Sequence, residues 1–354
     1  MTVFVQLLDE RGVRVPSAEF DPFVAHLTHA DLLGLYRDMV VVRRIDAEAT
    51  ALQRQGELAL WPPLLGQEAA QIGSGRALRA DDFVFSSYRE HAVAYTRGVR
   101  LVDLVRVWRG TTASGWDPFS IGMATPQVII GAQTLHATGY AMGIRNDGAD
   151  SVAVAYFGDG ATSEGDVSEA MVFAASFRAP VVFFCQNNHW AISEPVTLQS
   201  TVELADRAAG FGIPAIRVDG NDVLAVSAAT SSALARARAG EGPTFIEAVT
   251  YRMGPHTTAD DPTRYRDADE LAVWHGRDPI ARLAEHLRAA GVLDAAADAE
   301  VAAEADAVAA ELRAGCLALA DPEPLSIFEN VYAEPHPVLE RQRADYARYL
   351  DGFA

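Results

Sequence analysis

The amino-acid sequence predicts an α/β fold: a doubly wound parallel sheet flanked by helices, with a helical C-terminal extension. Apolar segments rich in β-forming residues alternate with helical segments between residues 81 and 250. The clearest unit spans 152–190 and reads as strand, helix, strand, with both strands ending abruptly on polar residues. Because strands of a βαβ unit are parallel, Gly158-Asp159-Gly160 and Asn187-Asn188 are expected at one sheet edge, where open α/β sheets bind ligands.

The chain divides into three predicted parts. Residues 1–30 show no regular period and form an N-terminal arm, residues 31–290 form the α/β domain, and residues 291–354 form a helical C-terminal region. This last region contains an Ala/Glu-rich helix and a proline-containing tail from Asp321. We expect the tail to wrap around a neighbouring subunit or the core.

The remaining elements follow from hydrophobic period and from Gly and Pro breaks. Before the central unit the sequence predicts helices over 31–52 and 66–78, a strand over 81–87 leading into a helix at 88, a helix over 101–109, a loop over 111–127 and a buried helix over 128–145. After it come a short helix over 203–210, a strand over 213–218, a helix over 222–239, a strand over 243–250, a loop over 251–267 and further helices from 269. Gly139 and Gly143 would let another backbone approach closely, either within the subunit or at a subunit interface.

The composition excludes several classes of protein. The net charge of −19 argues against binding to nucleic acid or to anionic membranes. The sequence contains no lysine, which excludes a pyridoxal phosphate Schiff base and a Walker-type phosphate loop. It contains only two cysteines, no export signal and no long apolar stretch, so we expect a cytoplasmic protein without disulfide framework or membrane span.

The polar strand ends predict a magnesium site. Asp159 and Asn188 each offer a hard oxygen ligand, and the backbone carbonyl of Trp190 offers a third. Gly158 and Gly160 would allow positive φ and the close approach of a phosphate. A helix starting just beyond them would add free N–H groups that favour an anion.

Gly-Asp-Gly on one strand end, with Asn-Asn on the next, resembles the thiamine diphosphate signature. From about residue 31 to about 290 the chain resembles the α subunits of the heterotetrameric 2-oxo acid dehydrogenase first component. The resemblance runs through L-Q-R-Q-G, G-Q-E-A, Y-R-E-H, I-I-G-A-Q, G-D-G-A-T-S-E-G-D, Q-N-N-H-W-A-I-S-E-P and Y-R-M-G-P-H-T-T-A-D-D-P-T-R-Y-R. It looks most like the pyruvate dehydrogenase α subunit of Gram-positive bacteria, through T-P-Q-V-I-I-G-A-Q and G-P-H-T-T-A-D-D-P-T-R-Y-R.

The resemblance implies a thiamine diphosphate-binding fold and a set of cofactor contacts. Tyr88 and Arg89 would hold the diphosphate, and Ile130 would help to keep the cofactor bent. His256 would be the catalytic residue, donating to the phosphate or to charge that develops in the reaction. The implied cofactor-binding residues are Tyr88, Arg89, Val128, Ile130, Gly158, Asp159, Gly160, Ala161, Asn188, Trp190 and His256, with Asp159, Asn188 and Trp190 binding Mg²⁺.

The 251–267 loop carries His256, and the resemblance implies that Arg252, Tyr265 and Arg266 hold it in place. Thr257 matches a position that is phosphorylated in mitochondrial relatives, and we expect no such regulation here.

Other features are weaker. His91 could line the pocket or be a polar residue at a helix start, and no role is assigned to His136 or His189. No zinc-ligand spacing is present. Where many relatives have a histidine-containing segment, this chain has S-G-W-D-P-F-S-I-G-M, a difference near the substrate end of the pocket.

The resemblance also implies a reaction and partners. Thiamine diphosphate supplies an electron sink for the loss of CO₂ from a 2-oxo acid. In this family the glutamate that ionises the cofactor lies on the β subunit. This chain should therefore bind the cofactor poorly alone, work as two α and two β chains, and pass the acyl group to the lipoyl group of an acyltransferase second component.

Several alternatives stay open. Pyruvate is favoured by the motifs, with a branched-chain acid such as 3-methyl-2-oxobutanoate, or acetoin, as the other substrates. A magnesium phosphohydrolase with Asp159 as nucleophile would want a second acid two residues on, where Ala161 stands. A non-catalytic scaffold subunit is disfavoured by the intact Asp159, Asn188, Arg89 and His256.

Overall fold

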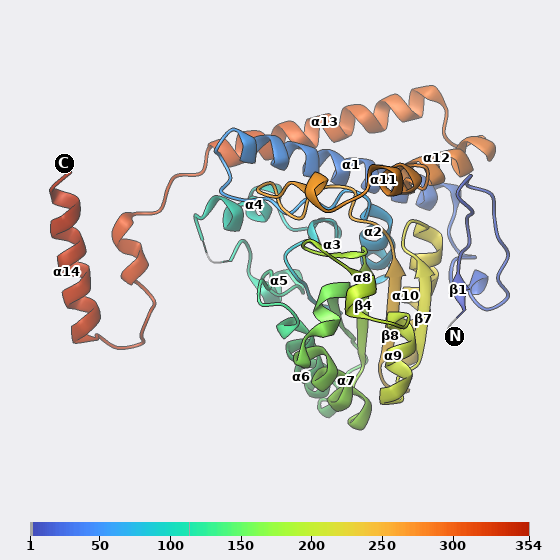
Figure 1. Cartoon of the computed structure of the whole chain (residues 1–354), viewed down its shortest axis with the longest axis horizontal. Coiled ribbons are helices and arrows are strands. Elements are labelled where there is room, and N and C mark those ends of the chain that lie inside the picture. Colours follow the sequence, from blue (N-terminus) through green and yellow to red (C-terminus); the bar gives the residue numbers. More distant parts are fainter. Residues whose placement is uncertain (1–2, 113, 354) are drawn as a thin grey trace.

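A six-stranded parallel sheet, in the order β1-β7-β8-β4-β3-β2, forms the centre of the molecule (Figure 1). The computed structural model describes residues 3–112 and 114–353. The strands are β1 (Phe4–Val5), β2 (Phe83–Phe85), β3 (Ala153–Gly158), β4 (Val181–Asn187), β7 (Ala215–Asp219) and β8 (Thr244–Val249), with a separate hairpin of β5 (Trp190–Ala191) and β6 (Glu194–Pro195).

Helices surround this sheet. The longer ones are α1 (His29–Arg54), α2 (Glu68–Ala77), α4 (Leu101–Arg109), α6 (Ala132–Asn146), α7 (Gly165–Ser176), α10 (Val223–Arg238), α11 (Ala268–His275), α12 (Pro279–Ala289), α13 (Ala295–Leu317) and α14 (Pro337–Asp351). The shorter ones are α3 (His91–Thr96), α5 (Pro118–Ile121), α8 (Val196–Gln199), α9 (Leu204–Ala208) and the 3₁₀ turns η1 (Asp21–Phe23), η2 (Asp159–Ser163), η3 (Ala209–Phe211), η4 (Pro262–Arg264) and η5 (Pro324–Phe328).

The sheet is covered on both faces, because successive side chains of a strand point to opposite sides. Val154 and Tyr156 of β3 belong to the core shared with α1, α2 and α10, while Ala155 and Phe157 belong to the core shared with α6 and α7. Strands buried on both faces read as continuous apolar runs, which is why 152–158 and 181–185 stand out in the sequence. The predicted doubly wound α/β fold is confirmed.

The largest difference from the predicted elements concerns the helix before the central unit. The buried helix predicted from 128 begins at Ala132, and Val128 and Ile129 before it are 60% and 68% exposed. The apolar run looked like the start of a core helix, but it is a loop. A Cβ on Gly139 or Gly143 would meet nothing within 4 Å, so no other part of the described chain approaches these glycines closely.

The two ends of the chain differ. β1 adds an edge strand beside β7, and the Asp222 carboxylate fixes the residues after it by accepting from the N–H groups of Leu7 (2.6 Å) and Leu8 (2.5 Å). At the other end no described residue from 321 to 353 is buried, and α14 lies away from the sheet (Figure 1). The tail therefore does not pack on the core of its own chain. The division into three parts at 30 and 290 stays a prediction.

No described helix combines the length and apolarity needed to cross a membrane.

Candidate active site

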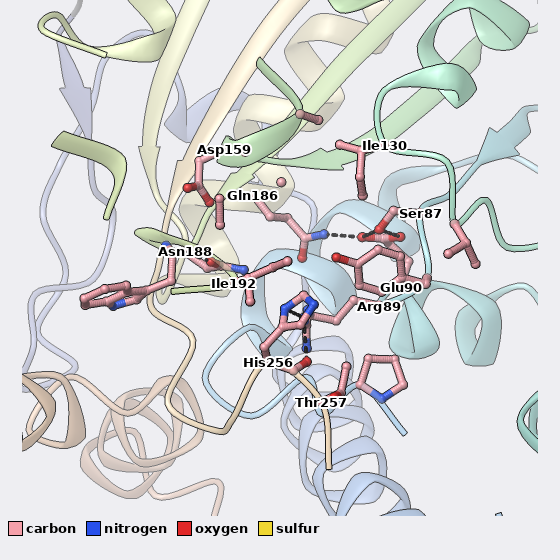
Figure 2. Close-up of a pocket in the computed structure, with 18 of the residues that line it drawn as sticks. Ser87, Arg89, Glu90, Ile130, Asp159, Gln186, Asn188, Ile192, His256 and Thr257 are labelled. Carbon is pink, nitrogen blue, oxygen red and sulfur yellow. Dashed lines mark hydrogen bonds between the residues drawn. The ribbon is translucent and has the colours of Figure 1, made fainter. Parts of the chain in front are cut away.

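A cavity of about 420 Å³ opens at the carboxyl edge of β3 and β4 (Figure 2). Parallel pairing sets Gly158 opposite Gln186, which brings the two polar strand ends side by side. Every cofactor-binding residue predicted from the sequence lines this cavity: Tyr88, Arg89, Val128, Ile130, Gly158, Asp159, Gly160, Ala161, Asn188, Trp190 and His256. The structure thus brings the predicted set together, whereas the role of each residue stays a prediction.

Asp159 and Asn188 form the end of the cavity where a cation was expected. Asp159 is 1% exposed, its Oδ2 accepts from Gln199 Nε2 (3.2 Å), and burial raises its pKa to about 6. Asn188 Oδ1 accepts from the Trp190 N–H (3.2 Å), while Asn188 Nδ2 donates to Gln67 Oε1 (3.1 Å). The described residues contain no group of three or more His, Cys, Asp or Glu side chains placed to hold a metal ion, so a cation here would depend on amide, carbonyl and ligand oxygens besides Asp159.

The positive φ expected at Gly158 and Gly160 is wrong, whereas the expected approach of a phosphate stays a prediction. Gly158 has φ −88°, and neither Gly158 nor Gly160 has a positive φ. A Cβ on Gly160 would lie 2.7 Å from the Cβ of Ala191. The second glycine is therefore required by the close contact with the β5–β6 hairpin, not by the backbone conformation.

Arg252 ties that hairpin to the loop that follows β8. Its guanidinium donates to the Trp190 carbonyl (3.1 Å), to the Ile192 carbonyl (2.6 Å) and to the Tyr265 hydroxyl (2.7 Å). Arg266 in turn donates to the Arg252 carbonyl (2.6 Å). These contacts agree with the predicted anchoring of the 251–267 loop. They also mean that a cation at the Trp190 carbonyl would share that oxygen with a guanidinium.

Arg89 joins the other wall of the cavity to the same loop. It is 5% exposed and donates to the carbonyls of Pro63 (2.6 Å) and His256 (2.9 Å). The His256 N–H donates to Asp260 Oδ2 (2.7 Å), which fixes the loop from its other side. Figure 2 shows Arg89 and His256 against each other at the edge of the cavity.

The surroundings of His256 determine the charge of its ring and the nitrogen that carries the proton. Burial, and then the charges of Arg89 and Arg252, lower its pKa to about 4, so the ring is neutral at pH 7. Its Nδ1 lies 3.2 Å from Arg89 Nη2 and 3.5 Å from Arg252 Nη1. Since a guanidinium only donates, Nδ1 must accept, and the ring proton is assigned to Nε2. His256 is therefore poised to donate one hydrogen bond without carrying a charge.

Aromatic and aliphatic side chains complete the walls. The Tyr88 ring stands edge-on to the His256 ring, with 6.0 Å between the two centroids. The Cζ atom of Arg89 lies 5.6 Å from the centroid of the Tyr88 ring. Val128 and Ile130 border the cavity from the loop before α6 and remain partly open to solvent.

Three polar residues that line the cavity were not predicted from the sequence: Ser87, Glu90 and Gln186. Glu90 is buried and accepts from Gln186 Nε2 (2.7 Å) and from Ser87 Oγ (2.8 Å), as Figure 2 shows. Burial raises the pKa of Glu90. A signal for Gln186 was available: it lies in β4 two residues before Asn188, which directly follows the strand, and the alternation of side chains along a strand would place both on the same side.

Two further amides were missed, Gln67 and Gln133, and each has one end without a hydrogen-bond partner. Gln133 Nε2 donates to the Tyr156 carbonyl (2.9 Å), but Gln133 Oε1 is buried and unpaired within the described chain. Gln67 Nε2 is likewise buried and unpaired there. Both residues line the cavity, and buried polar atoms are rarely left without partners in proteins. The two free ends point to a polar ligand.

His91 does not line this cavity, and that possibility was wrong. It is buried behind the cavity wall, stacked on Trp61 with 4.0 Å between ring centroids, and its Nε2 lies 3.1 Å from the Pro62 carbonyl.

Asp46 supports the segment that underlies Arg89. Its Oδ1 accepts from Trp61 Nε1 (2.8 Å) and from the Leu64 N–H (3.0 Å), on either side of the Pro63 carbonyl that Arg89 uses. Burial is the main reason why the pKa of Asp46 rises to about 7.

This burial predicts a pH-dependent stability. Because the folded pKa exceeds the unfolded value, the stability that Asp46 contributes is fully present below about pH 4 and is lost as the pH rises through about 7. Asp46→Asn keeps an acceptor and carries no charge. We therefore expect the variant to gain in melting temperature relative to the wild type as the pH rises, by about 5 °C between pH 5 and pH 8. An equal difference at both pH values, measured by thermal unfolding, would refute this.

Known proteins resemble this chain over most of its length. Residues 36–314 match the family described as the dehydrogenase E1 component. The chain is 49% identical over 340 residues to the 3-methyl-2-oxobutanoate dehydrogenase subunit alpha of Mycobacterium tuberculosis, which covers 96% of this chain and 92% of the relative. It is 44% identical over 290 residues to the pyruvate dehydrogenase E1 component subunit alpha of Staphylococcus epidermidis (81% and 77% covered). It is 43% identical over 305 residues to the corresponding Staphylococcus aureus subunit (86% and 81% covered).

Proposed function

Because the chain belongs to the dehydrogenase E1 component family, as the α subunit of a thiamine diphosphate-dependent 2-oxo acid dehydrogenase, we propose that it decarboxylates 3-methyl-2-oxobutanoate together with a β subunit. One observation carries this choice. Similarity to the mycobacterial branched-chain subunit is higher and extends over more of the chain than similarity to the staphylococcal pyruvate subunits. Pyruvate is the second candidate, supported by the motifs T-P-Q-V-I-I-G-A-Q and G-P-H-T-T-A-D-D-P-T-R-Y-R and by the staphylococcal relatives.

The cavity suits the cofactor that the family implies. Arg89 keeps two guanidinium N–H groups beyond those it gives to Pro63 and His256, and His256 offers its Nε2 proton. These are donors for an anionic diphosphate in a buried, weakly screened place. The unpaired Gln67 Nε2 and Gln133 Oε1 add a donor and an acceptor that ligand atoms would satisfy.

Mg²⁺ is proposed at Asp159, Asn188 and the Trp190 carbonyl. Three protein oxygens with only one negative charge suit a cation that takes its other ligands from a diphosphate and water. The raised pKa of Asp159 gives a second reason, since a buried carboxylate without a cationic partner is costly.

Bound thiamine diphosphate would supply the electron sink for loss of CO₂. The residues of this chain would hold and shield it. Tyr88, Arg89 and backbone N–H groups at Gly160 and Ala161 would bind the diphosphate, and Val128 and Ile130 would contact the rings. Neutral His256 would donate a hydrogen bond at the entrance without repelling Mg²⁺.

A β subunit is proposed as the partner, with the lipoylated acyltransferase as the acceptor of the acyl group. The relatives are named as alpha subunits. Helices α6 and α7, which lie side by side in Figure 1, expose Leu135, Tyr140, Val172 and Phe173, and Gly139 and Gly143 leave room against α6. Exposed apolar surface of this kind is typical of a subunit interface. The cytoplasmic location remains a prediction.

The test is a comparison of substrates with the assembled complex. We would co-express the chain with its β partner and measure dye-coupled decarboxylation of 3-methyl-2-oxobutanoate and of pyruvate. We expect kcat/KM to be at least about tenfold higher for the branched acid, since one extra methylene in an apolar pocket is worth about 1–3 kcal/mol. A preference for pyruvate would overturn the choice of substrate and leave the family unaffected.

A further inference from the structure

We propose that Gln67 is a positioning residue of the cation–diphosphate site, which orients the Asn188 amide with one end and donates to an anionic oxygen of the bound diphosphate with the other. The proposal rests on the function proposed above. It starts from the buried side chain of Gln67, at the N-terminus of α2, which lines the cavity and is 0% exposed.

The hydrogen bonds decide which way both amides point. The Trp190 N–H can only donate, so the Asn188 atom that meets it at 3.2 Å must be the oxygen Oδ1. The other end of Asn188 is then the Nδ2 group, which must find an acceptor, and Gln67 Oε1 provides it at 3.1 Å. Neither orientation is a free choice.

This arrangement bears directly on cation binding. An amide binds Mg²⁺ through its oxygen and never through its nitrogen. If Gln67 did not accept from Nδ2, that group would be buried without a hydrogen-bond partner. Rotation of the Asn188 side chain to find another acceptor would then lower the free energy. Gln67 thus stabilises the orientation in which Nδ2 is directed to Gln67, while Oδ1 accepts from the Trp190 N–H and keeps a second lone pair for the proposed cation. Residues that orient a metal ligand commonly affect metal affinity 10–100-fold.

The opposite end of Gln67 requires a ligand. With Oε1 given to Asn188, the remaining Nε2 carries two N–H groups and has no partner in the described part of the chain. An unpaired buried donor costs free energy, and a diphosphate oxygen would satisfy it. Because the residue borders the cavity and contacts Asn188, a diphosphate held in this cavity would offer the missing acceptor.

Two substitutions separate the two tasks. Gln67→Met keeps the length of the side chain and removes both the acceptor and the donor. Gln67→Glu keeps an acceptor for Asn188 Nδ2 and removes the donor. The control is Asn221→Leu. Asn221 is also a fully buried amide, but both of its ends are paired within the chain, with the Arg277 carbonyl (2.8 Å) and the Thr250 hydroxyl (2.6 Å), and it does not line the cavity.

Binding would be measured on the assembled α and β complex. The Kd of thiamine diphosphate comes from quenching of tryptophan fluorescence at saturating Mg²⁺, and cation affinity comes from Mn²⁺ electron paramagnetic resonance with thiamine diphosphate present. We expect Gln67→Met to weaken both by about tenfold. Gln67→Glu should weaken thiamine diphosphate by about tenfold and leave Mn²⁺ affinity at or above that of the wild type. Asn221→Leu should lower the melting temperature and leave both affinities within about twofold.

Each result decides the proposal. Affinities of Gln67→Met within about twofold of the wild type would overturn it, as would equal losses in the Asn221→Leu control. If the Met variant does not assemble, an unchanged thiamine diphosphate Kd in Gln67→Glu would overturn it. A wild-type complex that binds no thiamine diphosphate would instead overturn the proposed function itself, and this inference with it.

Discussion

Replacing Asp159 by Asn should reduce kcat/KM of the assembled complex by at least about 100-fold while leaving the chain as stable as before. The expected loss is large because Asp159 is proposed as the ligand that carries the charge. Substitution of a residue that only supports a metal ligand already lowers metal affinity or activity about 10–100-fold. Stability should be kept because burial raises the pKa of Asp159 to about 6, so its carboxylate is costly in the free chain and a neutral amide is not. Activity and thermal unfolding are measured on the same preparation.

The control for this prediction is Glu247→Gln. Glu247 is another fully buried carboxyl on the sheet, in β8, and it accepts from Asn187 Nδ2 (2.7 Å) and the Ala205 N–H (2.9 Å). It does not line the cavity, so we expect activity within about threefold of the wild type. Equal losses in both variants would mean that any buried carboxyl at this edge matters, and the cation site would lose its support.

Replacing Arg89 by Leu should raise the Kd of thiamine diphosphate by about 100-fold and loosen the loop that carries His256. A hydrogen bond to a charged group contributes about 1.5–3 kcal/mol, and Arg89 keeps two N–H groups for the diphosphate. It also donates to the carbonyls of Pro63 and His256, so its loss removes the link between the 61–66 segment and the loop. Arg89→Lys should fall between, because an ammonium group cannot bridge those carbonyls and a ligand at once.

Arg97→Leu is the matched control. Arg97 is a partly buried arginine that donates to backbone carbonyls, among them Ile121 (3.2 Å) and Arg79 (2.8 Å), but it does not line the cavity. It should lower the melting temperature without changing the Kd. Limited trypsin digestion at Arg264 and Arg266 would report the loop. An Arg89→Leu variant with wild-type affinity and the wild-type rate of cleavage would contradict the assigned role.

The features set by local pattern could be predicted from the sequence. The two strands of 152–190 are continuous apolar runs between turn residues, and parallel pairing then requires that Asp159 and Asn188 meet. The motifs Y-R-E-H and P-H-T-T-A-D-D supplied Arg89 and His256, which no period or propensity would have joined across the fold. The prediction that these two residues meet depended on the family resemblance. In the structure Arg89 Nη2 lies 3.2 Å from His256 Nδ1.

The features set by distant contacts could not be predicted. His91 was a candidate pocket residue or a polar residue at a helix start, but its ring stacks on Trp61, thirty residues earlier in the chain. Glycine is required at position 160 because Ala191 lies close to it, on a hairpin that was not predicted from the sequence. The roles of four polar lining residues depend on which end of each side chain meets which partner: Gln67, Gln133, Glu90 and Gln186. Such pairing is a tertiary property and leaves no periodic trace.

We propose that this chain holds one half of a thiamine diphosphate and Mg²⁺ site. The most direct measurement is the rate of 2-oxo acid decarboxylation by this chain alone, and by its complex with the β subunit, each with and without thiamine diphosphate and Mg²⁺. We predict turnover only when the β subunit, the cofactor and the cation are all present. Decarboxylation that persists after both the cofactor and the cation have been removed, or full turnover by the chain alone, would contradict the claim.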